Sequence, residues 1–231
     1  MKVSLLQHTP DPERSVALAA RLCYSSASIS ELDDRLSQSD IAAFLEKIMS
    51  LGHQSVLEHA SFTFGIEGIS RACSHQLVRH RLASYSQQSQ RYVTFKGDDF
   101  PQVIPASISS TAKRSELFSR AVKAAAEAYR DLVQDGVPAE DARFVLPNAA
   151  ETKIIVTMNA RELLHFFELR CCERAQWEIR ALAIEMLRLI KPAAPVIFSS
   201  AGPGCVSGGC PEGSMTCGKI REVRERFSAL G

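Results

Sequence analysis

Apolar and polar residues alternate along some short stretches of the chain. Ser61–Gly68 carries this alternation, which is typical of half-buried strands because successive side chains of a strand point to opposite faces. Residues 2–7 are also expected to form a short strand. The run Lys153–Met158 is apolar and rich in β-branched residues, which also favours a strand. Ser84–Arg91 is rich in Ser and Gln without an apolar period, so we expect an ordered loop or an irregular strand there.

Helical spacing of apolar residues covers much of the remaining chain. It predicts helices over Pro12–Tyr24, from a capping pattern at Ser30 to Gly52, Ile69–Arg81, Ser115–Gln134, Pro138–Leu146, two helices between Asn159 and Leu189, and Lys219–Phe227. We therefore expect an α+β fold in which helices surround a mostly antiparallel central sheet. We further expect one domain over residues 1–231, with a tail rich in Gly and Cys from about residue 199 to residue 231.

The charge balance excludes a protein whose whole surface binds nucleic acid or an anionic membrane. The chain has 27 Lys and Arg against 26 Asp and Glu, which leaves a net charge of +1. No apolar run approaches the roughly 18 to 20 residues of a membrane span, and Pro10 follows the start too soon for a signal peptide. Seven Cys, an odd number, suit a reducing compartment. We therefore expect a cytoplasmic protein with no nucleic-acid or membrane partner.

One segment nevertheless concentrates positive charge. Ile69–Lys96 holds five basic residues and two His but no Asp or Glu: Arg71, Arg79, Arg81, Arg91, Lys96, His75 and His80. On a helix, Gln76 lies near one face with Arg79 and His80, whereas Arg79 and Arg81 diverge. Two guanidinium groups that point in different directions suit two separate anionic ligands, because each offers a planar fork of donors to phosphate or carboxylate. A basic helix with a solvated polar loop is the alternative.

The sequence RHRLASYSQQSQR, which begins at Arg79, resembles a family signature. It matches the pattern RHRxxSxxxxSxR of the flavin-dependent thymidylate synthases at six fixed positions of thirteen, namely Arg79, His80, Arg81, Ser84, Ser89 and Arg91. Further segments follow in the family's order: GHQSVLEH, ARFVLP and MNARELLHFFELR. The resemblance therefore extends over most of the chain and falls on the same residues as the local anion site.

The resemblance implies a reductive methylation of dUMP to dTMP. Methylenetetrahydrofolate would be the carbon donor, reduced FAD the hydride source and NADPH its reductant, in a homotetramer whose active sites lie between subunits. In related proteins the nucleotide is held by the residues that match Gln76, Arg79, Gln87, Gln88, Ser89, Gln90, Arg91, Arg143 and Arg170. The residues that match His53, Ser55, Glu58, His80, Arg81, Leu82, Asn159, Arg161, His165 and Leu169 surround FAD.

One part of this assignment is visible in the residue spacing. Arg161, His165 and Leu169 are four residues apart and form one stripe of a predicted helix. That helix begins with Asn159 as N-cap and Glu162 at the third position. One cofactor fits along such a stripe, and an ordinary polar edge of a core helix is the alternative.

The implied reaction uses no enzyme cysteine as nucleophile, and no Cys occurs in the signature loop. We expect the catalytic residues to be Arg170, Arg79, Ser89 and His53. Arg79 and Arg91 would offset negative charge on the phosphate and on the uracil ring. Ser89 has no activating base nearby in sequence, so we expect it to form hydrogen bonds rather than to attack. His53 would orient the flavin or the folate.

Two positions depart from the family pattern. Gln87 stands where a number of family members have Glu, which argues against a carboxylate base at that position. Arg174 stands where some relatives have His, so it is left outside the FAD set.

Three cysteines of the tail suggest a zinc site at first sight. Cys205, Cys210 and Cys217 are separated by four and six residues. The tail has no C-x-x-C pair and no evident fourth ligand, so structural or reversible thiol roles are favoured and no metal is expected. Cys171 and Cys172 are adjacent, and they cannot both face one ligand on a helix.

Two other functions compete with the synthase. An RNA or single-strand binding module would use the basic segment with Tyr85, Tyr92 and Phe95 as stacking platforms, but the net charge near zero counts against it. A family member that binds FAD and nucleotide without the synthase reaction is the other alternative. The intact Arg79 and Arg91 argue against that one.

Overall fold

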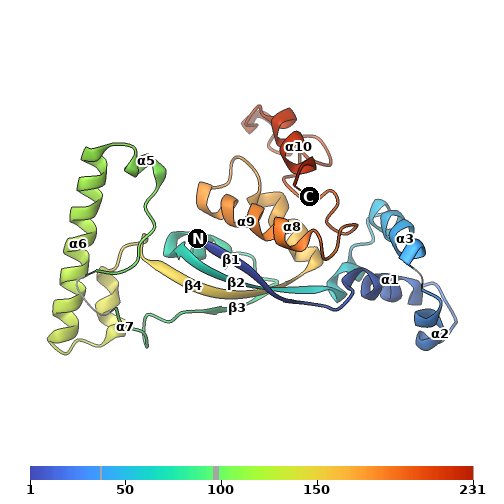
Figure 1. Ribbon diagram of the computed structural model, residues 1–231, viewed down its shortest axis with the longest axis horizontal. Helices are drawn as coiled ribbons and strands as arrows, with labels where there is room; N and C mark the ends of the chain where they lie inside the picture. The colour runs from blue at the N-terminus through green and yellow to red at the C-terminus, as the bar shows by residue number, and fades with distance from the viewer. Residues whose placement is uncertain (37, 96–98, 231) are drawn as a thin grey trace. The chain divides into compact units, whose positions relative to one another are not determined.

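Four strands form one sheet in the computed structural model, which describes residues 1–36, 38–95 and 99–230. They are β1 (Lys2–His8), β2 (Ser61–Ser70), β3 (Ala83–Gln87) and β4 (Glu151–Asn159), in the order β1-β2-β4-β3 (Figure 1). The sheet is antiparallel, which together with the helices confirms the α+β fold class. Lys96, named above in the basic segment, lies outside the described residues.

Helices make up most of the remaining described chain. They are α1 (Pro12–Leu22), α2 (Ile29–Asp34), α3 (Gln38–Ser50), α4 (Arg71–Leu77), α5 (Ala106–Ser109), α6 (Ala112–Gln134), α7 (Ala139–Ala142), α8 (Ala160–Arg170), α9 (Trp177–Ile190) and α10 (Ile220–Ser228), with the 3-10 helices η1 (Ser55–His59), η2 (Arg143–Val145) and η3 (Gly213–Met215). None of those described is both long and apolar enough to cross a membrane.

Two predicted helices have wrong bounds. The helix predicted over Ile69–Arg81 is α4, which ends at Leu77, so Arg79 and Arg81 lie outside it. The helix predicted from Ser30 to Gly52 is divided into α2 and α3, and its cap is Ser28. The Ser28 side chain accepts the N–H of Glu31, and the Glu31 carboxylate accepts the N–H of Ser28 at 2.9 Å, a complete capping box. Of the two alternatives predicted for Ser84–Arg91, an ordered loop or an irregular strand, the structure has a strand, β3, over Ala83–Gln87.

Internal contacts divide the chain into two compact units. The α6 unit comprises Met1–Lys2, Ile66–Arg79 and Tyr85–Ile155, and the α8 unit comprises Val3–Gly65, His80–Ser84 and Val156–Gly231. Each of the four strands contributes residues to both units. The expectation of a single domain with a tail therefore stays a prediction.

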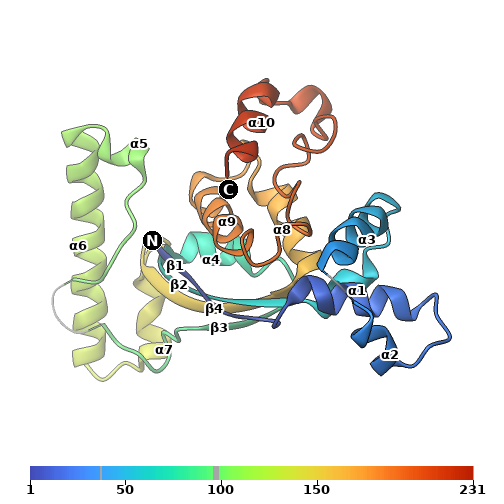
Figure 2. The same ribbon diagram turned by 45° about the vertical axis from the view of Figure 1, so that its right-hand side comes forward.

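Aromatic rings form the centre of the core in the α8 unit. Phe62 of β2 meets Phe198 edge-on, with ring centres 5.4 Å apart, and Phe198 also meets Phe167 of α8. All three rings are fully buried, and burial of each contributes roughly 1.5–3 kcal/mol. α8 packs against α9 and η1 (Figure 2). This packing fixes the orientation of α8, which carries the stripe predicted from the sequence.

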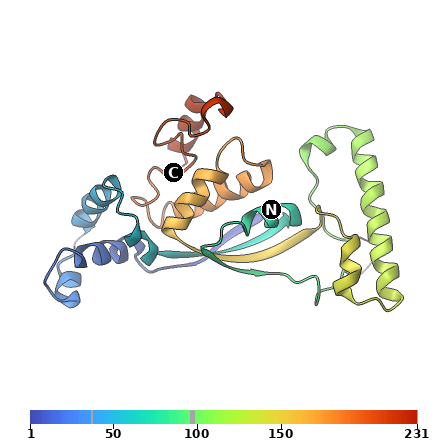
Figure 3. The same cartoon turned by 180° about the vertical axis from the view of Figure 1, so that it is seen from behind.

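The α6 unit has its own buried cluster. Phe100, Val122, Ala126 and Ala150 form it, and Phe95 packs against it. α6 lies against α5 and α7 and contacts η2 (Figure 3). The cluster therefore holds η2, the short helix that begins with the nucleotide candidate Arg143, beside α6.

Candidate functional site

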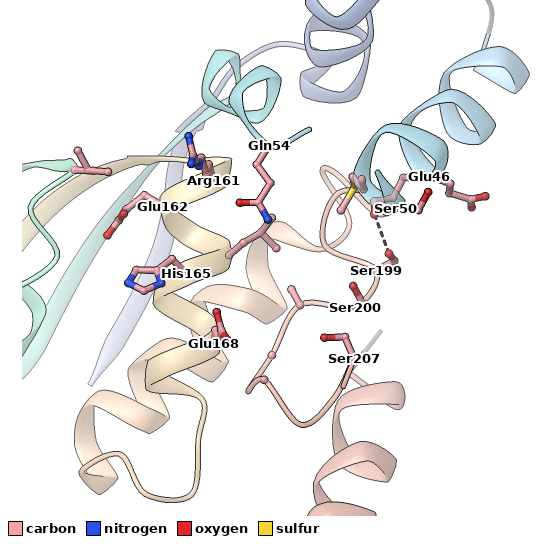
Figure 4. A pocket seen from close by; sticks show the side chains of 17 residues that line it. Glu46, Ser50, Gln54, Arg161, Glu162, His165, Glu168, Ser199, Ser200 and Ser207 are labelled. Atoms are coloured by element: carbon pink, nitrogen blue, oxygen red, sulfur yellow. Dashed lines mark hydrogen bonds between the residues drawn. The ribbon is translucent and has the colours of Figure 1, made fainter. Parts of the chain in front are cut away.

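The α8 unit contains a cavity of about 850 Å³ (Figure 4). Arg161, Glu162, His165 and Glu168 of α8 form one wall, Glu46 and Ser50 of α3 another, and Ser199, Ser200 and Ser207 line the side formed by the tail. The cavity is also lined by Gln54 and by the apolar Met49, Leu82 and Leu164. The volume lies in the upper part of the range of about 300–1,000 Å³ for small-molecule sites. The cavity can therefore hold a large ligand with both apolar and polar parts.

The stripe predicted on α8 is present in the structure. Asn159 is the N-cap, and its Oδ1 accepts the N–H of Glu162 at 2.9 Å. Arg161, His165 and Leu169 are all exposed, whereas the neighbouring Phe rings of the helix are buried. Arg161 and His165 line the large cavity, and Leu169 lies at a second, smaller one. Two of the three stripe residues therefore face the same ligand space.

Residues from distant segments surround the start of α8. Arg161 Nη1 donates to Glu58 Oε1 of η1 at 2.5 Å, which joins two members of the predicted FAD set. His53 and Ser55 are exposed on either side of Gln54, which lines the cavity. Arg81 is exposed next to Leu82, another lining residue. All ten candidates for FAD binding lie in the α8 unit.

His80 connects α8 to a catalytic candidate. Arg170 Nε donates to His80 Nε2 at 3.0 Å, so this ring nitrogen acts as an acceptor and carries no proton. His80 Nδ1 lies 3.2 Å from Glu162 Oε1 and therefore donates its proton to that carboxyl group. His80 and Glu162 are both buried, whereas Arg170 is half-buried. The chain Glu162–His80–Arg170 thus fixes the direction in which the Arg170 guanidinium points.

The electrostatics agree with a neutral His80. Burial first, and then the charges of Arg170 and His165, lower the pKa of His80 from 6.5 to about 4. Burial raises the pKa of Glu162. A neutral imidazole can accept from Arg170 and donate to Glu162 at the same time, whereas an imidazolium can only donate.

The low pKa of His80 predicts a loss of stability in acid. Between pH 6.5 and about pH 4 the unfolded chain binds a proton at this ring that the folded chain excludes, so stability falls as the pH is lowered through this window. The raised pKa of Glu162 changes the stability with pH in the opposite direction. The parent is therefore compared with a His80 variant that keeps Glu162. We expect the Tm of the parent protein to fall more steeply over this window than the Tm of His80→Asn. The exposed His59 supplies the control, since His59→Asn should keep the parent slope; equal slopes in all three proteins would contradict a neutral His80.

The α6 unit brings several nucleotide candidates around one acidic residue. Arg91 Nε lies 2.6 Å from Glu140 Oε2, and Arg143 Nε donates to the backbone carbonyl of Glu140 at 2.9 Å. Arg143 also lies close enough to Arg71 for its charge, after burial, to lower the pKa of Arg71. Arg91 is paired with a carboxylate, whereas Arg143 donates to a backbone carbonyl and lies near a second guanidinium, so positive charge is in local surplus, which suits a phosphate.

Hydrogen bonds hold the end of β3 and the polar loop that follows it. The Gln87 amide donates to Ser74 Oγ at 2.9 Å and to Thr152 Oγ1 at 3.1 Å, and the N–H of Gln88 donates to Lys153. Ser89 Oγ accepts the N–H of Arg91 at 3.1 Å. These bonds hold the loop in position, which is what a nucleotide site requires of it.

The remaining candidates are placed more loosely. Gln90 is half-buried next to Arg91. The Gln76 amide donates to the Ala72 carbonyl within its own helix, and Arg79 is exposed in the turn after α4. Eight of the nine nucleotide candidates lie in the α6 unit, and Arg170 lies in the α8 unit.

Sequence reasoning missed three residues that organise these groups. Glu162 was expected only at the start of α8, yet its side chain reaches His80 across 82 sequence positions. Glu140 was not singled out, and Arg71 was named only as a member of the basic segment, although Arg91 pairs with Glu140 and Arg143 lies near Arg71. The one sequence signal for Glu140 was its position close to the ARFVLP segment.

Comparisons with known proteins agree with the geometry. The family model described as "Thymidylate synthase complementing protein" matches residues 4–196. A protein of Geobacter sulfurreducens named flavin-dependent thymidylate synthase is 76% identical over 230 residues, which cover 100% of this chain and 99% of the relative. Proteins with the same name from Clostridium tetani and Pyrococcus horikoshii are 49% and 46% identical, over 98% and 100% of this chain and 97% and 98% of their own lengths.

Proposed function

This chain belongs to the flavin-dependent thymidylate synthase family, and from that premise we propose which of its residues carry each part of the reaction. The protein methylates dUMP to dTMP with FAD as its cofactor and with a folate and NADPH as co-substrates. The proposal divides the work between the units: the α8 unit binds FAD, and the α6 unit binds most of the nucleotide.

The large cavity of the α8 unit is the proposed FAD site. One observation carries this assignment: a cavity of about 850 Å³ lies against the helix stripe that the sequence marked for the cofactor. Leu82 and Met49 offer apolar surface for a flat ring system, and Arg161 offers charge-assisted hydrogen bonds to a pyrophosphate. The other proposed residues are His53, Ser55, Glu58, His80, Arg81, Asn159, His165 and Leu169.

The proposed nucleotide site is built from the basic residues of the α6 unit. Arg91 pairs with the Glu140 carboxylate, Arg143 donates to the Glu140 backbone carbonyl, and Arg71 lies near Arg143, so we propose that an entering phosphate replaces the carboxylate as the partner of Arg91. The ordered loop of Gln87, Gln88, Ser89 and Gln90 supplies neutral donors and acceptors to base and sugar, and Gln76 and Arg79 complete the set.

Reduced FAD supplies the hydride that completes the methyl group, and the protein contributes position and electrostatics. We assign to Arg170 the stabilisation of negative charge that develops on the uracil ring, because His80 fixes its guanidinium. Arg79 acts in the same way on the nucleotide, and Ser89 forms hydrogen bonds. His53 orients the flavin or the folate. None of the proposed nucleotide or FAD residues is a cysteine, in agreement with a reaction that needs no thiol nucleophile.

An absorption spectrum tests the proposed function directly. Purified protein with added FAD is reduced with NADPH under anaerobic conditions, before and after addition of dUMP. We expect flavin bands that bleach, and that bleach faster with dUMP, because the reduced flavin acts on the nucleotide in the reaction of this family. A protein that binds no flavin at any concentration would overturn the proposal and would lead to a test of the basic segment for RNA binding.

The Arg91–Glu140 pair gives a prediction about dUMP affinity. Arg91→Ala should weaken dUMP binding by about 2 kcal/mol or more, roughly thirtyfold, because a charge-assisted contact to the nucleotide is lost. Glu140→Gln is the matched control, since it keeps Arg91 and removes the carboxylate that competes for it. We expect it to bind dUMP at least as tightly as the parent in calorimetry. Unchanged affinity in Arg91→Ala would remove Arg91 from the site.

We also propose that the protein acts as a homotetramer in the cytoplasm. The family resemblance supports the assembly, and the described cysteines, all of which are free thiols, agree with a reducing compartment. Light scattering of the purified protein tests the tetramer, and a monomeric mass in the active fraction would contradict it.

A further inference from the structure

Four cysteines line a second cavity in the α8 unit, which has a volume of about 110 Å³. They are Cys172, Cys205, Cys210 and Cys217, and all four are free thiols. In the described part of the chain, the other three cysteines do not line this cavity: Cys23, Cys73 and Cys171. The convergence is therefore selective rather than a general property of the cysteines.

The fourth cysteine comes from a segment that the tail sequence does not reveal. Cys172 follows the last residues of α8, 33 positions before Cys205. Its neighbour Cys171 is fully buried in the core, whereas Cys172 is half-buried at the cavity. The two adjacent cysteines therefore point to different surroundings, as expected for consecutive positions. Cys172 is the fourth thiol, which was not evident from the sequence of the tail.

Two of the four thiols are held firmly. Cys172 is attached to the packed end of α8, and the backbone carbonyl of Cys205 accepts from Arg224 Nε at 2.9 Å. Gly204 is packed so closely that an added Cβ would lie 3.1 Å from Pro211 and 3.2 Å from Glu168. This half of the cavity is therefore fixed by the fold.

The other two thiols lie on a looser part of the tail. Cys210 and Cys217 are flanked by Gly209 and Gly218, and an added Cβ at either glycine would meet no atom within 4 Å. Both cysteines are half-buried. Cys205 interacts electrostatically with each of the other three sulfurs. The chain beside Cys210 and Cys217 therefore has open space at Gly209 and Gly218, although Pro211 packs against Gly204.

We propose that Cys172, Cys205, Cys210 and Cys217 bind one Zn²⁺ ion that closes the tail around itself. Four thiolates in tetrahedral arrangement are a preferred ligand set of structural zinc. Binding releases the thiol protons to solvent and involves no change of oxidation state. The proposal does not depend on the assigned synthase residues.

The metal-free arrangement is open. Within residues 1–36, 38–95 and 99–230, no group of three or more His, Cys, Asp or Glu side chains is arranged to hold a metal ion. The cavity of about 110 Å³ has room for an ion, and the sulfurs must move closer together to reach it. The open glycines of the tail permit that movement, and coupling of metal binding to local folding is common in small zinc sites.

Closure would also define one wall of the FAD cavity. Gly204 and Glu168 line both cavities. A bound ion would therefore order the tail segment that carries Ser199, Ser200 and Ser207.

Metal analysis and cobalt spectroscopy test the zinc site. We expect about one zinc ion per chain in full-length protein purified without chelator. After removal of the metal, Co²⁺ should produce thiolate-to-cobalt charge-transfer absorption, with about tenfold or greater loss of affinity in Cys210→Ser and Cys217→Ser. The exposed Cys23 provides the matched control, because Cys23→Ser should bind Co²⁺ like the parent.

Three results would overturn the zinc site. The first is a folded, reduced protein without bound zinc that shows no thiolate absorption with Co²⁺. The second is parent-like Co²⁺ affinity in both Cys210→Ser and Cys217→Ser. The third is a disulfide between two of the four cysteines in freshly purified protein, which would assign them a redox role instead. Flavin absorption recorded on the same samples separates failure of the zinc site from failure of the FAD site.

Discussion

Arg161→Ala is expected to release FAD from a protein that still folds. Arg161 lies at the exposed start of α8, where its side chain contributes little to the core, and it lines the large cavity. Among the described residues that line the cavity it is the only Arg, so its loss removes the strongest of these donors for a pyrophosphate. We expect the Kd for FAD to rise about a hundredfold, or about 3 kcal/mol, in a fluorescence titration of the apoprotein.

The ion pair between Arg161 and Glu58 requires a control for simple loss of a salt bridge. Arg188 of α9 forms a comparable exposed pair with Glu185, at 2.6 Å, and does not line the cavity. Exposed pairs of this kind contribute about 0–1 kcal/mol, so Arg188→Ala should retain both stability and FAD affinity. If Arg161→Ala retained FAD as tightly as Arg188→Ala does, the stripe on α8 would not be the cofactor site.

The local features of the fold were predictable because they depend on neighbours in sequence. The alternation in β2 and the cap at Asn159 each arise within a few residues, and both are confirmed. β3 was not recognised as a regular strand because its five residues, ASYSQ, are mostly polar and none is fully buried, so their alternation of half-buried and exposed positions gives only a weak signal. Its strand conformation comes from pairing with β4, which sequence periodicity does not record.

The same distinction between local sequence and packing applies to the candidate site. Spacing placed Arg161 and His165 on one face of a helix, and that arrangement is confirmed. The role of Glu162 could not be read in this way, because its partner His80 lies in a different segment and the contact depends on how α8 packs. The fourth thiol of the tail cavity, Cys172, was missed for the same reason. Motifs identify residues of a site, and packing decides which residues hold them in position.

Arg170→Lys is expected to abolish most dTMP formation while FAD remains bound. The Arg170 guanidinium donates through Nε to His80, and this bond sets the plane and direction of its fork of donors. A lysine ammonium keeps the charge but has no planar fork, so it cannot donate to His80 and present two donors in the same plane. Loss of an oriented donor to a developing charge costs about 10²–10³ in kcat, which product analysis at saturating dUMP would measure.

Arg180→Lys is the matched control for this substitution. Arg180 is also partly buried in the α8 unit and donates to a backbone carbonyl, that of Glu173, at 2.7 Å, but it lines neither cavity. If charge or packing alone mattered, the two Arg→Lys variants would lose similar activity. A direct role of the oriented guanidinium instead predicts near-parent kcat for Arg180→Lys and a parent-like flavin spectrum for both.

His80→Asn separates orientation from charge, because it keeps Arg170 and removes its acceptor at Nε2. A kcat equal to that of the parent would show that the Glu162–His80–Arg170 chain does not position the catalytic group.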